Sequence, residues 1–189
     1  MKIERKTHET EVSLTLDPDI ASDPAVRTGI PFFDHMLSSM SFHGRFALSV
    51  EGRGDLDVDP HHLVEDVGLV LGQAFLAVFE RTKSVARFGH AVIPMDEALS
   101  EVTIDVCGRP TLSLHGSFPQ LSAGTFDLWL LREFFIALSS QAQISLHLDL
   151  RRGENSHHMA ESAFKALGKA LKQAYSLERQ EMSSKGRIG

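Results

Sequence analysis

The sequence predicts an α+β protein of two layers, made of a duplicated half-domain with the helices on one face of each sheet. Three observations lead to this prediction. The pentapeptide HHxxE occurs twice, at residues 61–65 and 157–161. Each copy begins a stretch with the apolar period of a helix, and each follows a segment in which apolar and polar residues alternate as in a half-buried strand. We expect one repeat to span residues 1–92 and the other residues 93–189.

The first repeat opens with strand-like alternation at residues 12–16, followed by a helical segment around residues 32–37. A second alternating segment at residues 45–50 leads into a glycine-rich turn. Asp59 and Pro60 then precede the first HHxxE motif, and such a pair is typical of a helix N-terminus. We therefore expect the two histidines of this motif in the first turn of a helix.

The second repeat follows the same plan. Alternating segments at residues 102–106 and 111–114 come first, a helical segment at residues 131–138 follows, and residues 144–150 alternate again. Asn155, just before the second motif, is a typical helix N-cap. Each repeat is thus predicted to contain strands, a helix, a strand and a helix in that order, which favours a two-layer arrangement.

The spacing inside the motif predicts metal ligands. Residues three and four apart share one face of a helix, so His61 and Glu65 converge while His62 points about 100° away. The positive end of the helix dipole should lower the pKa of each histidine and keep a nitrogen lone pair free for a metal ion. Upstream, one His and one Glu stand at matching places in the two repeats. The candidate ligands are His35, His61, His62, Glu65, Glu133, His157, His158 and Glu161.

A set of imidazoles and carboxylates without sulfur suits Mn(II), Fe(II), Zn(II) or Co(II), and the sequence does not choose among them. Four protein ligands for each ion leave positions open for a substrate, which favours catalysis over a structural role. Four other histidines lack this pairing and are expected to be surface or structural residues: His8, His90, His115 and His147.

Composition excludes several other classes of protein. The net charge of −6 argues against a nucleic-acid surface, which needs a concentrated basic face. The single cysteine, Cys107, excludes a disulfide within the chain and suits the cytoplasm. The N-terminus lacks the apolar stretch of a signal peptide, and the longest apolar run, residues 67–79, is too short to cross a bilayer. We expect a cytoplasmic protein with neither a nucleic-acid nor a membrane partner.

Seven short segments occur in a specific order along the chain. They are residues 5–10 (RKTHET), 28–37 (TGIPFFDHML), 59–66 (DPHHLVED), 94–99 (PMDEAL), 108–110 (GRP), 155–158 (NSHH) and 183–186 (SSKG). Together they resemble the imidazoleglycerol-phosphate dehydratase family of histidine biosynthesis. The resemblance implies a duplicated half-domain with the ribosomal protein S5 domain 2-like fold and two Mn(II) ions per active site. It also implies a homo-oligomer of 24 subunits with the sites between subunits.

The resemblance also implies roles for individual residues. It implies that all the candidate ligands named above bind the metal ions. Glu133 stands where many relatives have His, and a carboxylate suits a hard ion such as Mn(II). Ser39 stands where Gln is common, which puts any contact of that Gln in doubt. The implied substrate contacts are Glu9, His43, Arg87, Arg109, Lys165, Ser183 and Lys185.

The implied reaction is the dehydration of imidazole glycerol phosphate to imidazole acetol phosphate. Guanidinium forks and hydroxyl donors suit the phosphate of this small substrate. We expect Glu161 or Glu9 to transfer the proton and His43 to lie near the departing hydroxyl. Two other functions stay open. One is a metal-dependent hydrolase, because metal ions with open positions also activate water. The other is a non-catalytic protein in which metal clusters tie subunits together.

Overall fold

The computed structural model describes residues 1–82 and 84–178. The first repeat contains β1 (Lys2–Lys6), β2 (Thr10–Asp17), β3 (Ala25–Arg27), α1 (Pro31–Gly44), β4 (Ala47–Gly54) and α2 (His61–Thr82). The second contains β5 (Phe88–Met95), β6 (Ala98–Val106), β7 (Thr111–His115), β8 (Ser122–Ala123), β9 (Phe126–Asp127), α3 (Leu130–Ala142), β10 (Ile144–Arg152) and α4 (Ser156–Ala174). Every helix and strand predicted from periodicity is present.

The two four-stranded sheets have the same topology. The strand order is β1-β2-β4-β3 in one and β5-β6-β10-β7 in the other. In each sheet three strands pair antiparallel, and the remaining edge strand, β3 or β7, pairs parallel with its neighbour. The short β8–β9 hairpin is an addition to the second repeat. The boundary predicted between residues 92 and 93 lies within β5.

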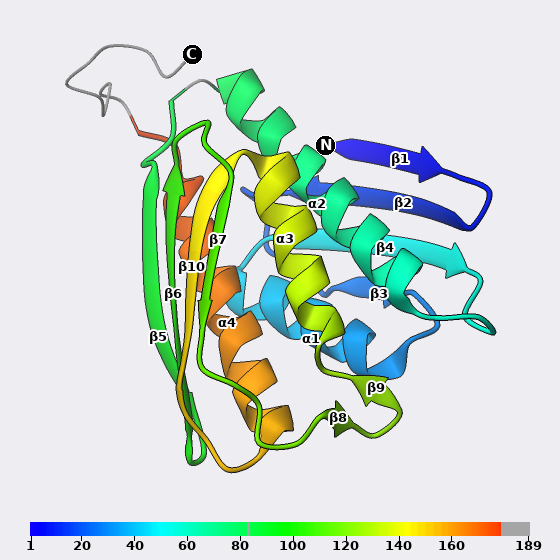
Figure 1. The fold of residues 1–189 in the computed structure, drawn as a ribbon. Helices are drawn as coiled ribbons and strands as arrows, with labels where there is room; N and C mark the ends of the chain where they lie inside the picture. The colour runs from blue at the N-terminus through cyan, green and yellow to red at the C-terminus, as the bar shows by residue number, and fades with distance from the viewer. Residues whose placement is uncertain (83, 179–189) are drawn as a thin grey trace.

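The four helices lie between the two sheets, as Figure 1 shows. Helix α1 packs on α4 and α2 packs on α3, so each helix pair joins one helix from each repeat. Strand residues alternate between buried and exposed, as in β2 and β4, because only one face of each sheet meets the helices. Each repeat is therefore two-layered, and the repeats pack helix face to helix face around one core.

Two glycines let the helix pairs approach closely. A Cβ at Gly168 of α4 would lie 2.0 Å from the carbonyl oxygen of Met40 in α1, and a Cβ at Gly72 of α2 would lie 2.7 Å from that of Leu138 in α3. Gly72 and Gly168 hold the same place in their repeats, seven residues beyond the Glu of each HHxxE motif. The same crossing therefore brings α1 to one motif and α3 to the other.

Helix α2 is also, among the described residues, the one helix whose length and apolar composition would allow it to cross a membrane. Most of its apolar window, 61%, is buried inside the fold. Its hydrophobicity serves the contact with α3 and the first sheet, as expected for the core helix of a globular domain.

Candidate metal centre

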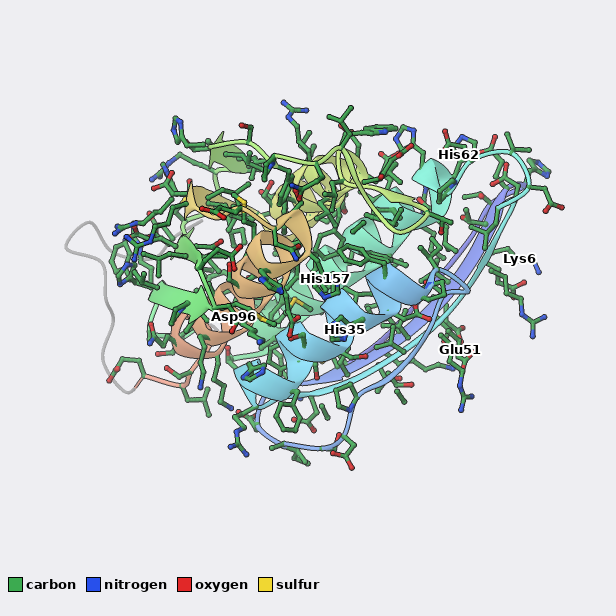
Figure 2. All side chains as sticks on the ribbon, turned by 90° about the horizontal axis from the view of Figure 1, so that it is seen from below. Lys6, His35, Glu51, His62, Asp96 and His157 are labelled. Atoms are coloured by element: carbon green, nitrogen blue, oxygen red, sulfur yellow. The ribbon has the colours of Figure 1, made fainter. Side chains whose placement is uncertain are left out.

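The N-terminal turns of α1 and α4 bring three candidate ligands together. One ligand atom each of His35, His157 and Glu161 lies within 4.8 Å of the other two. The Oε2 atom of Glu161 is 3.3 Å from Nε2 of His35 and 3.4 Å from Nε2 of His157. Figure 2 shows the two histidines side by side. Of the residues that the structure describes, this is the one group of three or more that comes so close.

Lys165 completes the surroundings of Glu161. Its Nζ lies 2.9 Å from Oε1 of Glu161, one helical turn away on α4. Burial of Glu161 acts to raise the pKa of its carboxyl group, but Lys165 and His35 together hold the pKa below its ordinary value. Glu161 is therefore ionised and points one oxygen at the lysine and the other at the two imidazoles.

The N-terminal turns of α2 and α3 form a looser counterpart. His61 Nε2 lies 3.7 Å from Oε2 of Glu65, and the ring of His61 meets the edge of Trp129 with ring centroids 5.4 Å apart. Glu133 holds the place on α3 that His35 holds on α1, five residues before the carbonyl that meets the glycine. Its Oε1 lies 3.6 Å from Nη1 of Arg132. Here the ligands share one region without converging on one point.

Both motifs begin their helices as predicted. The Oδ1 atom of Asp59 accepts the backbone N–H of His61 at 2.8 Å, and Oδ1 of Asn155 accepts that of His157 at 2.9 Å. These caps satisfy amide groups that would otherwise lack partners in the first turn. They fix the direction in which each His–Glu pair leaves its helix.

The second histidine of each motif points away from its neighbours, as the helical spacing predicts. Nδ1 of His62 lies 3.1 Å from Oδ2 of Asp55 and 3.7 Å from Oε2 of Glu9. Nδ1 of His158 lies 2.8 Å from Oε2 of Glu97. Figure 2 shows His62 far from the pair of His35 and His157.

The expected lowering of the histidine pKa values by the helix dipole is wrong for His62 and His158. Hydrogen bonding to Asp55 raises the pKa of His62, and hydrogen bonding to Glu97 raises that of His158. The same contact, with help from the backbone of Asn155, lowers the pKa of Glu97 to about 2. A carboxylate in contact outweighs the partial charge at the end of a helix. The residues of the two HHxxE motifs give no indication that Asp55 and Glu97 lie beside these histidines.

A buried carboxylate ties the Glu9 turn to α2. Asp66 is 7% exposed and accepts hydrogen bonds from Nε of Arg5 at 2.7 Å and from Oγ1 of Thr10. These two residues flank the turn that carries Glu9, and Thr7 Oγ1 accepts the N–H of Glu9 at 3.1 Å. The turn is thereby held beside His62.

Ser162 is the counterpart of Asp66 in the second repeat. Its Oγ lies 2.7 Å from Oγ of Ser100 on β6, and it also donates to the carbonyl of Met159. The position after the motif's Glu thus joins helix to strand in both repeats, by an ion pair in one and by hydroxyl groups in the other.

The residues implied to bind the substrate fall in different places. His43 lies on α1, where burial and then the charges of Lys165 and Lys169 lower its pKa, so it stays neutral. Arg87 is paired with Asp105, with Nε 2.7 Å from Oδ1. Ser183 and Lys185 lie outside the described residues.

Arg87 and Arg109 lie at the far end of the molecule from His157. The backbone N–H of Arg87 bonds the carbonyl of Ala174 at the C-terminal end of α4, and its carbonyl accepts the N–H of Val106 just before the turn that carries Arg109. His157 starts the same helix, 17 residues earlier, so the helix alone separates them by about 26 Å. One chain cannot bring these arginines to His157.

The duplicated half-domains and the clustered His and Glu side chains at their helix junction define a protein with a candidate metal centre shared by two repeats. The family model for imidazoleglycerol-phosphate dehydratase matches residues 28–171. The chain belongs to the imidazoleglycerol-phosphate dehydratase family, which places it among the dehydratases, a class of lyases, of histidine biosynthesis.

Individual relatives agree. The imidazoleglycerol-phosphate dehydratase of Syntrophus aciditrophicus is 49% identical over 93% of this chain and 90% of its own, and that of Acidithiobacillus ferrooxidans is 46% identical over 92% and 87%. Among solved structures, the enzyme from Pyrococcus furiosus matches with a TM-score of 0.86 at 32% identity, covering 98% of this chain and 100% of its own. That from Staphylococcus aureus matches with 0.83 at 37%, covering 94% and 99%. These matches confirm the predicted fold class.

Proposed function

We propose that this chain is a Mn(II)-dependent imidazoleglycerol-phosphate dehydratase that converts imidazole glycerol phosphate to imidazole acetol phosphate in the cytoplasm, with two Mn(II) ions per active site. The convergence of His35, His157 and Glu161, in a chain of this family, is the observation that carries the proposal. The donors are imidazole nitrogens and a carboxylate oxygen, which suit Mn(II). The residues therefore fit the ion.

Each ion is assigned three ligands from one helix pair. One takes the group of His35, His157 and Glu161, and the other takes His61, Glu65 and Glu133. His62 and His158 diverge from these groups, so each supplies the fourth ligand to a site on a neighbouring copy of the chain. When bound, the two ions supply Lewis acidity to the nitrogens of the substrate imidazole, which acidifies the ring.

The geometry supports a site built from several subunits. Arg87 and Arg109 suit a phosphate, yet they lie about 26 Å along α4 from His157 within one chain. A neighbouring copy would bring this pair of arginines to the metal centre. We propose a homo-oligomer, of 24 subunits as in the family resemblance, with Ser183 and Lys185 adding to the phosphate contacts.

Glu9 is the better placed of the two candidate proton-transfer groups. The carboxylate of Glu161 is occupied by Lys165 and two imidazoles, whereas Glu9 is exposed in the β1–β2 turn and its Oε2 lies 3.7 Å from Nδ1 of His62. We propose that Glu9 accepts the carbon-bound proton. The neutral imidazole of His43 then takes the position near the departing hydroxyl.

The test combines metal analysis with a dehydration assay. The purified protein should contain two Mn(II) ions per chain, and it should release water from imidazole glycerol phosphate only when loaded. Hydrolysis of a phosphate ester in place of dehydration would favour the hydrolase. Metal-dependent assembly without any turnover would favour the non-catalytic protein.

A further inference from the structure

Glu97 connects three groups around the second HHxxE motif. It lies in the β5–β6 turn, and its Oε1 accepts the backbone N–H groups of Glu154 and Asn155 at 3.0 and 2.8 Å. Its Oε2 lies 2.8 Å from Nδ1 of His158. The two carboxylate oxygens therefore have separate tasks, because one holds the loop before α4 and the other holds the imidazole.

The contact decides which nitrogen of His158 carries the proton. A neutral imidazole has one N–H and one lone pair, and an ionised carboxylate only accepts hydrogen bonds. Nδ1 must therefore be the donor, and Nε2 keeps its lone pair. The exposed carboxylate of Asp96 lies 3.7 Å from Nε2, which is too far for a hydrogen bond and favours a cation there.

We propose that Glu97 is a positioning residue that accepts the Nδ1 proton of His158, so that the neutral form of the imidazole presents the lone pair of Nε2 to a metal ion. The inference rests on the proposed function, in which His158 ligates an ion. Metal-binding histidines generally donate their other ring N–H to a carboxylate or carbonyl, and loss of that partner lowers metal affinity by roughly 10–100-fold.

Asp55 and His62 in the first repeat provide a matched comparison. Both oxygens of Asp55 lie near Nδ1 of His62, at 3.2 and 3.1 Å, and among the described residues neither oxygen accepts a backbone N–H. An Asn at this position can rotate to offer its carbonyl oxygen to Nδ1. At Glu97 the two backbone N–H groups hold an acceptor at the Oε1 place, so the NH₂ of a Gln must face His158.

Glu97→Gln should therefore reverse the hydrogen bond. The amide would donate to Nδ1, move the ring proton to Nε2 and block the lone pair that the metal needs. Glu97→Ala removes the partner without imposing the wrong tautomer, because water can accept from Nδ1. It also removes the acceptor for two backbone N–H groups, which Gln keeps.

The experiment titrates Mn(II), and separately Zn(II), into the full-length protein and its Glu97→Gln, Glu97→Ala and Asp55→Asn variants. Urea unfolding of the metal-free proteins is measured alongside. We expect Glu97→Gln to weaken one class of sites by roughly 10–100-fold, Glu97→Ala by less, and Asp55→Asn by no more than about threefold. The stability to urea should follow the reverse order for the two Glu97 variants, with Glu97→Ala less stable than Glu97→Gln.

Opposite orders in metal binding and stability would separate positioning from a merely structural role. Glu97→Gln that binds both ions as tightly as the wild type, or metal losses that simply follow stability, would overturn the inference. A wild-type protein that binds an ion without dehydrating imidazole glycerol phosphate would contradict the proposed function alone. A wild-type protein that binds neither ion would overturn both.

Discussion

The two HHxxE motifs share sequence, helix position and capping, yet their surroundings differ. In the second repeat, Glu161 lies within 3.4 Å of two imidazoles and is paired with Lys165. In the first, Glu65 lies 3.7 Å from a single imidazole, and Leu69 stands where Lys165 stands in α4. The partner helix completes the difference, because α1 contributes His35 and α3 contributes Glu133.

This comparison shows that the motif supplies only half of a site. The facing helix and the residue one turn further along set the charge and the convergence. The α1–α4 cluster balances Glu161 against Lys165, whereas the α2–α3 cluster holds two carboxylates with Arg132 at its edge. We expect the second repeat to hold the preformed site and the first to need a bound cation to draw its carboxylates together.

The strongest test of the comparison is to remove the carboxylate from each motif. Glu161→Gln should lose more than the roughly 10–100-fold in Mn(II) affinity that removal of a residue orienting a ligand costs. Glu65→Gln should lose less, because Glu65 contacts one imidazole only. Mn(II) titration measures both, and Glu80→Gln, on the exposed end of α2, serves as a control. Equal losses at the two motifs would remove the distinction.

The helix crossings should also respond unequally. Gly168→Ala places a Cβ 2.0 Å from a backbone oxygen, and Gly72→Ala places one at 2.7 Å. Overpacking of this kind costs about 1–3 kcal/mol in unfolding free energy, and we expect Gly168→Ala at the upper end. Urea denaturation of the metal-free proteins gives the values. Equal losses would make the two crossings equivalent, and a larger loss for Gly72→Ala would contradict the prediction.

The groups that join helix to strand differ in chemistry, which provides a third test. Asp66→Ala leaves the guanidinium of Arg5 without its buried partner, and should cost about 1–3 kcal/mol. Ser162→Ala removes one hydroxyl contact and should cost about 0.5–1.5 kcal/mol. The first variant should also reduce turnover by loosening Glu9, an effect that Ser162→Ala lacks. Steady-state kinetics and urea denaturation measure the two effects. Equal turnover in the two variants would contradict the prediction.

Lys165→Leu makes the second motif resemble the first. Lys165 helps to lower the pKa of Glu161, so its loss should raise that pKa and move the acid limb of Mn(II) binding to higher pH. In the metal-free protein, a carboxyl group whose pKa is lower in the folded state than in the unfolded state stabilises the fold at pH values above the unfolded-state pKa. This stabilisation is lost as the pH falls through the folded-state pKa. Metal content measured from about pH 4 to 7 shows the shift. An unchanged limb would mean that Lys165 leaves Glu161 unaffected.

Periodicity predicted the strands and helices that have a clear buried face, such as β2, β6 and α4. It missed β1, β3, β5 and the β8–β9 hairpin. In β1, Lys2–Lys6, no residue is fully buried and four of the five are charged, and β3 is only three residues long. Segments like these gain their structure from pairing with a neighbour, so their own sequence carries little signal.

Only part of the candidate site was predicted, because the rest depends on contacts between segments far apart in the chain. The i, i+4 spacing placed His157 and Glu161 together, and the repeat pointed to His35. The spacing does not point to Asp55, Asp66 or Glu97, because these residues act through contacts between turns and helices far apart in the chain. Their positions within or next to the motif segments were the available signal.

The sequence by itself determined the duplication, the helix starts and the face on which each His–Glu pair lies, because these depend on local spacing and capping. Only the tertiary structure decided that α1 meets α4 and α2 meets α3, that one cluster converges and the other does not, and that two histidines are held by carboxylates from turns. Those outcomes depend on close packing at Gly72 and Gly168 and on charges brought together across the fold, which no local pattern encodes.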